Sequence, residues 1–557
     1  MTTGQTSKGL RVPRRYTMEG TDPYSTIEWA RRDSRITNPD GSVVFEVLDA
    51  EVPASWSQVA TDIVVSKYFR KAGVPQTDAE GQPILDDQGH PVLGSETSGR
   101  QVFDRLATTW RWWGEEHGYF ASPADAQAYE DEMKYMLANQ IASPNSPQWF
   151  NTGLALAYGI TGTPQGFWFV DPVTGEMTES PDSYTHPAPH ACFINGVSDD
   201  LVNPGGIMDL WVREARLFKM GSGTGSNFSQ IRAENETLSG GGKSSGVMGF
   251  LRIGDRAAGA IKSGGTTRRA AKMVILDLDH PDVEEFIDWK MHEKEKARIL
   301  INHGGYAADF NGEAYSTVSG QNSNNSVRVS NEFIEAVRND DDWQLRERTT
   351  GRVRKTLKAR DLWRKVAEAA WACADPGVQF DTIINEWHTS PAGGKIRATN
   401  PCAEYVFLDN TACNLASINL VKFFDDDSNV FDTEGYEHAI RLWTITLEIS
   451  VTMAHFPSRE IAQGSYDYRT LGLGYANLGT LLMRMGLPYD SDAGRAVSGA
   501  ITAILTGYAY ATSAELAAAV GTFPRFAENR EAMLRVIRNH RRAAYNTSQA
   551  EYEGLSH

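Results

Sequence analysis

The chain has few cysteines and lacks two common metal-binding patterns. Its 557 residues include four cysteines, none in Cys-x-x-Cys spacing. This scarcity argues against a disulfide-stapled secreted protein and against a structural zinc site. The chain also contains no Glu-x-x-His, which is the pattern of protein di-iron centres. We therefore predict no metal site.

Long apolar runs and excess positive charge are also missing. The net charge of -17 argues against a general affinity for nucleic acid. Residues 1–20 have no apolar core and so do not form a secretory signal. Residues 493–520 are rich in alanine but contain Arg495 and Glu515, which predicts a packed helix ended by Gly521. We expect a cytoplasmic protein that contacts neither membrane nor nucleic acid.

Hydrophobic periodicity predicts two regions. Residues 1–140 read as a mainly helical N-terminal region, irregular up to residue 34, and residues 141–557 alternate short apolar runs with helical stretches. Such alternation predicts an α/β fold with parallel strands. The expected strands are 42–50 and 272–279, and the expected helices are 62–72, 100–118, 124–139, 281–292, 359–374 and 435–454.

Two glycine-rich segments raise the question of phosphate binding. Residues 220–226 and 239–246 could each cradle an anion with backbone N–H groups, although a surface turn is the simpler reading. The second ends in Gly-Lys-Ser, but position 237 is Thr where a P-loop needs glycine. Arg268 and Arg269 add a positive cluster. The polar segment 319–326 could read base edges or could be a solvated loop.

The stretch from Asn400 to Glu404 is the strongest sign of chemistry. In an extended segment, Asn400, Cys402 and Glu404 would point to the same side. An amide, a thiol and a carboxylate would then face one small molecule. A buried structural cysteine beside a surface glutamate is an equally good reading of the spacing alone. A further cysteine, Cys413, follows closely.

Several ordered motifs together resemble the adenosylcobalamin-dependent (class II) ribonucleotide reductases. The likeness runs over essentially the whole chain. It is carried by residues 51–60, 143–151, 191–194, 219–232 and 279–282, and by the segments around Asn400 and Cys413. The resemblance implies a ten-stranded α/β barrel of the ribonucleotide reductase type, of which this chain would cover only a part.

The resemblance also implies roles for the polar residues. Cys402 would carry the thiyl radical, Glu404 would be the base for the ribose 3′-hydroxyl, and Asn400 would hold that hydroxyl. Cys192 and Cys413 would form the redox pair that reduces the substrate. Cys373 matches no role, and we interpret it as a buried apolar residue.

Further positions match binding sites of the family. The positions that match substrate contacts include the whole central run, Asn400, Pro401, Cys402, Ala403 and Glu404. They also include Ser146, Ala191, Cys192 and Gly223. For an effector, either a deoxynucleotide or ATP, the matching positions are Asp200, Lys219 and Arg232. The polar segment 319–326 resembles the one that passes effector identity to substrate choice.

The implied partners are a ribonucleotide substrate, adenosylcobalamin, a thioredoxin-type reductant and a second copy of the chain in a homodimer.

The sequence departs from the family pattern because it lacks a Pro-Thr-Gly-Thr phosphate loop. We therefore expect a truncated chain, or one half of a split enzyme with a C-terminal partner chain. The alternative function is a nucleotide-binding chain that is catalytically incomplete without that partner. The sequence distinguishes neither diphosphate from triphosphate substrates nor any cobalamin-contacting residue.

Overall fold

The computed structural model describes residues 9–37, 41–78, 81–261, 270–309 and 312–556. The chain divides into two compact units. Unit 1 comprises Met1–Ala191, Cys413–Pro524 and Ala543–Thr547, and unit 2 comprises Cys192–Ala412, Arg525–Arg542 and Ser548–His557. Unit 1 therefore runs past residue 140 and takes in a second segment from much farther along the chain. The predicted positive cluster at Arg268 and Arg269 lies outside the described residues.

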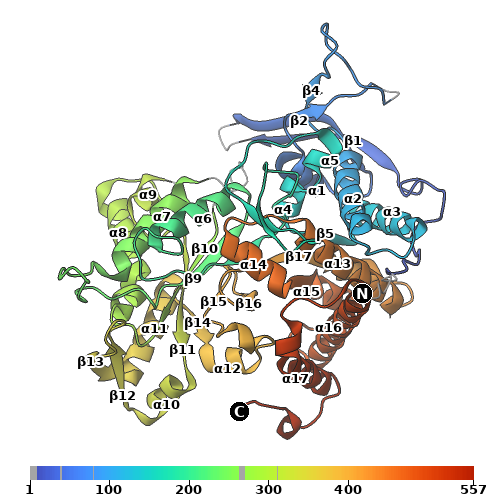
Figure 1. The fold of residues 1–557 in the computed structure, drawn as a ribbon. Coiled ribbons are helices and arrows are strands. Elements are labelled where there is room, and N and C mark those ends of the chain that lie inside the picture. Colours follow the sequence, from blue (N-terminus) through green and yellow to red (C-terminus); the bar gives the residue numbers. More distant parts are fainter. Residues whose placement is uncertain (1–8, 38–40, 79–80, 262–269, 310–311, 557) are drawn as a thin grey trace. The chain divides into compact units, whose positions relative to one another are not determined.

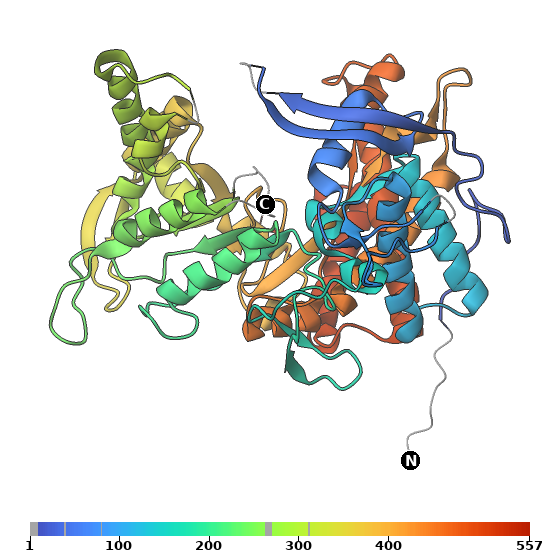
Figure 2. The same cartoon turned by 90° about the horizontal axis from the view of Figure 1, so that it is seen from above.

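Unit 1 combines helices with short strand pairs and one long pair. Figure 2 shows the long pair, in which β1 (Trp29–Thr37) and β2 (Val43–Pro53) run antiparallel. The other elements of its first segment are α1 (Gln58–Ile63), the π-helical turn η1 (Val64–Tyr68), β3 (Val74–Pro75), β4 (Leu93–Gly94), α2 (Gly99–Glu116), α3 (Pro123–Ala138), β5 (Ala142–Pro144), α4 (Ser146–Asn151), α5 (Leu154–Tyr158), β6 (Trp168–Val170) and β7 (Met177–Glu179). Those of its second segment are β17 (Thr411–Asn419), η4 (Leu420–Phe423), β18 (Phe424–Asp425), β19 (Val430–Phe431), α13 (Thr433–Met453), α14 (Arg459–Tyr468), β20 (Leu471–Ala476), α15 (Leu478–Arg484) and α16 (Asp492–Val520).

Helix α13 forms the centre of unit 1. Most of its side chains are buried, as expected for a helix that is apolar on nearly every face. The ring of Trp443 packs edge to face on that of Trp110 in α2, with 5.8 Å between the ring centres. The hydroxyl groups of Thr446 and of Tyr129 in α3 share a hydrogen bond of 2.6 Å. Helix α13 therefore joins the two segments of unit 1 into one hydrophobic core.

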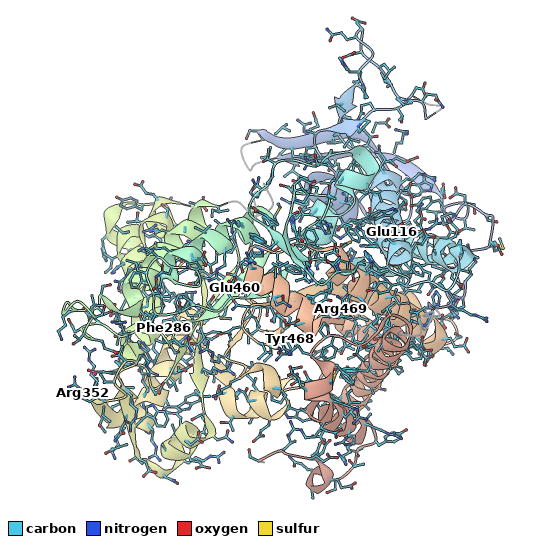
Figure 3. The ribbon with its side chains drawn as sticks, in the orientation of Figure 1. Glu116, Phe286, Arg352, Glu460, Tyr468 and Arg469 are labelled. Carbon is cyan, nitrogen blue, oxygen red and sulfur yellow. The ribbon has the colours of Figure 1, made fainter. Side chains whose placement is uncertain are left out.

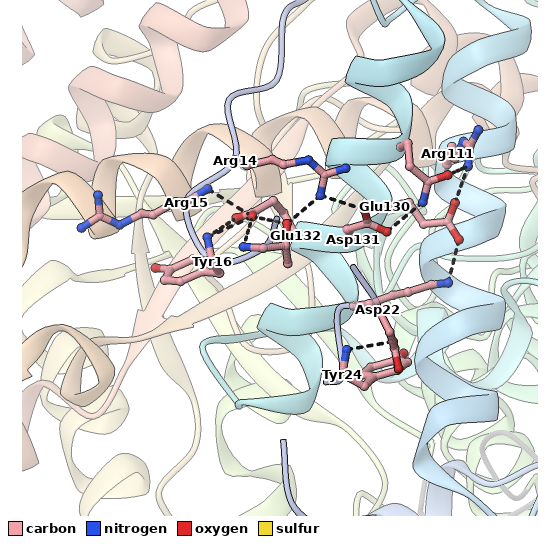
Figure 4. A network of polar contacts seen from close by, with 12 residues as sticks. Arg14, Arg15, Tyr16, Asp22, Tyr24, Arg111, Glu130, Asp131 and Glu132 are labelled. Carbon is pink, nitrogen blue, oxygen red and sulfur yellow. Dashed lines mark hydrogen bonds and ion pairs between the residues drawn. The ribbon is translucent and has the colours of Figure 1, made fainter. Parts of the chain in front are cut away.

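Residues 9–28, the described segment before β1, are held by acidic residues of α3 (Figure 4). The buried Glu132 carboxylate accepts hydrogen bonds from the backbone N–H groups of Arg15 and Tyr16 and from His438. Asp131 pairs with Arg14 at 2.8 Å. The segment thus lacks regular structure, as predicted, but is fixed by side chains.

Unit 2 contains five parallel strands in the order β14-β11-β10-β9-β8. These are β8 (Cys192–Ile194), β9 (Gly223–Asn227), β10 (Lys272–Asp277), β11 (Asn324–Val329) and β14 (Gly377–Phe380). The parallel α/β arrangement predicted from the alternating pattern is confirmed. Strands β8, β9, β10 and β11 are buried almost throughout, which is typical of parallel sheets covered by helices, whereas the edge strand β14 is largely exposed.

Helices complete unit 2 (Figure 1). Phe286 of α8 is buried in their core, whereas Arg352 lies on the exposed β12–β13 hairpin (Figure 3). The remaining elements are α6 (Ile207–Lys219), α7 (Gly246–Ala260), α8 (Val283–Gly304), α9 (Glu313–Thr317), α10 (Asn331–Asn339), β12 (Asp342–Arg346), β13 (Val353–Lys358), α11 (Ala359–Cys373), α12 (Asp381–Glu386), η3 (Pro391–Gly393), β15 (Ala398–Thr399), β16 (Val406–Phe407), α17 (Phe526–Ala544) and η5 (Gln549–Glu551).

Most expected helices and strands appear near their predicted residues, with two corrections in the N-terminal region. Helical structure runs over residues 58–68 instead of 62–72, because Ser57 caps the helix with its hydroxyl. Residues 29–34, predicted to be irregular, belong to β1. Among the described residues, no helix is long and apolar enough to cross a membrane.

Unit 1 contains the buried histidines His190 and His455 and the half-buried His186. Burial lowers the pKa of His186 to about 4 and that of both His190 and His455 to about 3. The His455 ring stacks on Phe167 at 4.3 Å. His186 and His190 have the four-residue spacing of a helical metal motif, but their segment is not helical.

These histidines predict that unit 1 loses stability in mild acid. The pKa of His455 in the folded protein is below the ordinary 6.5. Below pH 6.5 this histidine therefore binds more protons in the unfolded chain than in the folded protein. The free energy of unfolding therefore falls as the pH drops from about 6.5, by about 2 kcal/mol for His455 alone between pH 7 and pH 5. Denaturant titration of His455→Gln should show a pH dependence weaker by that amount, whereas exposed His90→Gln should keep the wild-type slope. Equal slopes for all three proteins would contradict this assignment.

Candidate active site

The Asn400–Glu404 stretch forms the turn of a short hairpin. Strands β15 and β16 pair antiparallel, with Thr399 opposite Val406, and the chain reverses between them. Ala403 has a φ of 66°, a left-handed conformation that turns the backbone sharply. The predicted extended segment is therefore wrong: the side chains are brought together by a turn and not by strand alternation.

Asn400 organises the polar side chains around this turn. Its side chain is fully buried, and its Nδ2 donates to the Cys192 Sγ over 3.0 Å. Its Oδ1 accepts from the backbone N–H of Tyr405 over 2.9 Å, which closes the turn. The Cys192 thiol in turn donates to the Glu404 Oε1 over 3.4 Å. Asn400, Cys192 and Glu404 thus form one contact group although more than 200 residues separate Cys192 from the others.

Cys402 occupies the exposed part of the same turn. Its side chain is exposed, while the neighbouring Asn400 and Pro401 are buried. A thiol in this position is accessible to a reactant, while the buried residues Asn400 and Pro401 hold the backbone of the turn in place.

Two glycines of β9 allow the hairpin to approach the sheet. A Cβ at Gly223 would lie 2.8 Å from the Pro401 Cγ, and a Cβ at Gly225 would lie 1.8 Å from the Thr399 oxygen. Residues 223–227 form a buried strand, so the interpretation of 220–226 as a flexible surface turn is wrong. The glycines are needed for close backbone packing. The second glycine-rich segment, 239–246, is an exposed turn over most of its length.

Two residues that were not predicted to contact the hairpin also hold it, although one of them, Asn324, belongs to the polar segment 319–326. Asn324, at the start of β11, donates to the Pro401 carbonyl over 2.8 Å. Gln379 of β14 donates to the Thr399 hydroxyl over 3.0 Å. Single amides carry no recognisable pattern, so only the topology reveals them.

The polar segment 319–326 is anchored and is not a solvated loop. The buried Asp255 of α7 accepts hydrogen bonds from the backbone N–H groups of Gly320 and Asn322, each over 2.8 Å. Glu293 of α8 accepts from the Ser319 N–H over 2.8 Å. From residue 324 onward the segment is β11, and it leads directly to the Asn324 contact with the hairpin.

The predicted effector residues all lie in unit 2. Asp200 is half-buried, and its carboxylate accepts hydrogen bonds from the N–H groups of Val202 and Asn203 in its own loop. Arg232 pairs with Asp199, not Asp200, at 2.6 Å. Lys219 is the last residue of α6.

The other predicted residues fall in unit 1. Cys413 is buried on β17 and lies beside Gly472 of β20. A Cβ added at Gly472 would lie 2.8 Å from the Cys413 Sγ. Ser146 begins α4 and hydrogen-bonds the Tyr68 hydroxyl over 3.0 Å, and Ala191 ends the first segment of the unit. Cys373, in unit 2, was predicted to be buried but is half-buried. The described residues contain no group of three or more His, Cys, Asp or Glu that could hold a metal ion.

Comparison with known proteins identifies the family. The family model described as "Ribonucleotide reductase, barrel domain" matches residues 190–556, and "Class II vitamin B12-dependent ribonucleotide reductase" matches residues 30–140. The vitamin B12-dependent ribonucleotide reductase of Agrobacterium fabrum is 55% identical, over 98% of this chain and 49% of that protein. Those of Bradyrhizobium diazoefficiens and Streptomyces avermitilis are 54% and 46% identical, over 98% and 96% of this chain and 50% and 51% of the relatives.

The chain spans about half the length of these curated relatives. The barrel match over residues 190–556 confirms the predicted α/β fold class. Together with the N-terminal match, it shows that the chain belongs to the ribonucleotide reductase family, in its vitamin B12-dependent class II.

Proposed function

We propose that this chain carries the catalytic centre of an enzyme that reduces ribonucleotides to 2′-deoxyribonucleotides. The observation that supports this most directly is that Asn400 and Glu404 of the turn both contact Cys192, while the same turn exposes Cys402. Once the Cys402 thiol has been converted to a thiyl radical, these groups can take a hydrogen atom from a ribose, hold its hydroxyl and accept a proton.

In this proposal each residue has a separate task. Cys402, as a thiyl radical, removes the 3′ hydrogen atom of the ribose. Glu404 takes the 3′-hydroxyl proton, while Asn400 holds that hydroxyl. The thiols of Cys192 and Cys413 supply two electrons and two protons and become a disulfide. One proton leaves with the 2′-hydroxyl as water, the other becomes the new hydrogen at C2′, and Glu404 returns its proton to the 3′ oxygen. The hydrogen atom returns from Cys402 to C3′, so atoms and electrons balance.

The cofactor that we propose is adenosylcobalamin, which supplies an organic radical when it is bound. The exposed thiol of Cys402 fits such a group, because a bound cofactor would have to approach the sulfur directly. The buried Asn400 and Pro401 hold the turn in place during this approach. A thioredoxin-type protein would then restore the Cys192 and Cys413 thiols.

We further propose that a deoxynucleotide or ATP bound near Asp200, Lys219 and Arg232 sets substrate choice, with a second copy of the chain completing a homodimer. The polar segment supports such coupling, because it is anchored by Asp255 at one end and contacts Pro401 through Asn324 at the other.

A reduction assay on the holoenzyme tests the function. Ribonucleoside diphosphates and triphosphates are each supplied with adenosylcobalamin, a dithiol and an effector nucleotide. We expect a deoxyribonucleotide from one of the two substrate classes, and only when the cofactor is present. Absence of product from both classes, or product formed equally well without adenosylcobalamin, would refute the proposal.

A further inference from the structure

A cavity of about 420 Å³ lies in unit 2 at the carboxyl ends of β10 and β11. It is distinct from the β15–β16 hairpin that carries Cys402. Asn324, which contacts Pro401 of that hairpin, stands at the beginning of β11, whereas Arg328, which lines the cavity, stands near the end of β11. Ligands of α/β proteins commonly bind outside the carboxyl ends of parallel strands. No role proposed above uses this cavity.

The charged residues of the lining favour an anion. Two of its carboxylates already have partners outside the cavity, since Asp279 pairs with Arg348 at 3.0 Å and Asp342 pairs with Lys358 at 2.8 Å. The charged groups that then remain are three cations and two carboxyl groups, namely Arg328, Arg346, Lys395, Asp277 and Asp381.

These five groups differ in whether they form ion pairs. Asp381 is shared between Arg328 at 2.7 Å and Lys395 at 2.5 Å. The guanidinium of Arg346 contacts the carbonyl of Gly351 and the amide oxygen of Gln344, which are neutral acceptors. When the outside partners Arg348 and Lys358 are counted, five cations therefore stand against the four carboxyl groups of the lining.

Asp277 strengthens this preference. It is the last residue of β10 and accepts a hydrogen bond from the Asn227 amide over 2.9 Å. Burial raises the pKa of Asp277, and the nearby Asp279 acts in the same direction against the opposing charge of Arg328. Compared with an ordinary aspartate, this carboxyl group is more easily protonated, and a protonated carboxyl donates a hydrogen bond to an anion.

We propose that this cavity binds a small molecule through a phosphate group. Arginine guanidinium groups match phosphate oxygens in charge and in planar geometry, and Lys395 adds a flexible third cation. The volume lies in the range of small-molecule sites, so there is room for more than the phosphate itself. The half-buried indole of Trp343 offers an apolar surface for the rest of the ligand. The proposal does not depend on ribonucleotide reduction.

The cavity is joined to the segment that leads into the catalytic hairpin. Lys395 lines it, and the carbonyl of the next residue, Ile396, accepts from the Arg328 guanidinium over 2.7 Å. The carbonyl of Arg397 accepts from the Asn227 amide over 2.9 Å. A phosphate that restrains Lys395 and Arg328 would therefore slow amide hydrogen exchange in residues 395–399.

The test is calorimetric titration of the holoenzyme with inorganic phosphate and, separately, with ribose 5-phosphate. Arg346→Glu reverses the charge of an exposed side chain and should weaken binding at least about tenfold, because a charge-assisted contact is lost. Arg364→Glu, an equally drastic change at an exposed position of α11, should bind as the wild type does. Tighter binding of ribose 5-phosphate identifies a phosphorylated metabolite as the ligand, and equal binding identifies free phosphate.

Three results would overturn the proposal. The wild type could bind neither probe, Arg346→Glu could bind as well as Arg364→Glu, or exchange in residues 395–399 could stay unchanged when the probe is bound. Circular dichroism of both variants checks that the fold is retained, and Lys395→Glu gives a second test at another exposed side chain.

Discussion

Replacing Cys402 by serine is expected to abolish deoxyribonucleotide formation and to leave the fold intact. The substitution exchanges one atom on an exposed side chain of the turn, so the free energy of unfolding should change by no more than about 0.5 kcal/mol. The chemistry should be lost, because an alcohol O–H bond is much stronger than a thiol S–H bond and does not yield a radical. We expect activity to fall at least about 10³-fold, as for the loss of other central catalytic groups.

Cys373 provides the matched control for this experiment. It is half-buried at the end of α11 in the same unit, and its thiol donates to the Ala369 carbonyl over 3.2 Å. Cys373→Ser keeps that hydrogen bond and should retain activity near the wild-type level. If Cys402→Ser stayed active, or if both serine variants lost activity equally, Cys402 would not be the radical residue.

Replacing Lys272 by methionine should destabilise unit 2 strongly. The Lys272 ammonium is buried on β10, 2.5 Å from the Glu214 carboxylate and 4.0 Å from the ring centre of Trp211. Burial lowers the pKa of Lys272, and Glu214 opposes this by favouring the charged form. Without the ammonium, the Glu214 carboxylate remains buried without its cation. Breaking a buried ion pair in this way costs about 3–5 kcal/mol, which denaturant titration measures directly.

Two further variants isolate the cause of this loss. Adding Glu214→Gln to Lys272→Met removes the uncompensated charge while keeping an acceptor for the Thr224 hydroxyl, so most of the stability should return. Lys296→Met removes the ammonium from a pair whose lysine side chain is 62% exposed, and it should cost less than about 1 kcal/mol. Equal losses for Lys272→Met and Lys296→Met would show that the buried pair contributes no special stability.

Local pattern accounts for the elements that the sequence predicted correctly. Helix α13 and helix α16 appear within two residues of their expected starts, because long periodic runs and clear caps specify a helix wherever it packs. Short glycine-rich runs are different. Residues 223–227 have the composition of a turn, yet they form a buried strand, because the hairpin beside them leaves no room for side chains. Tertiary packing overrides local preference there.

The sequence by itself determined the family and the residue types of the candidate site. Asn400, Cys402 and Glu404 stand within five residues, so their proximity is a property of the chain. Only the tertiary structure decided how they are used. It places Asn400 and Glu404 on Cys192 through a hairpin turn, and it anchors that hairpin through Gly223, Gly225 and Asn324. Contacts between residues far apart in the chain depend on strand order and register, which short-range patterns do not encode.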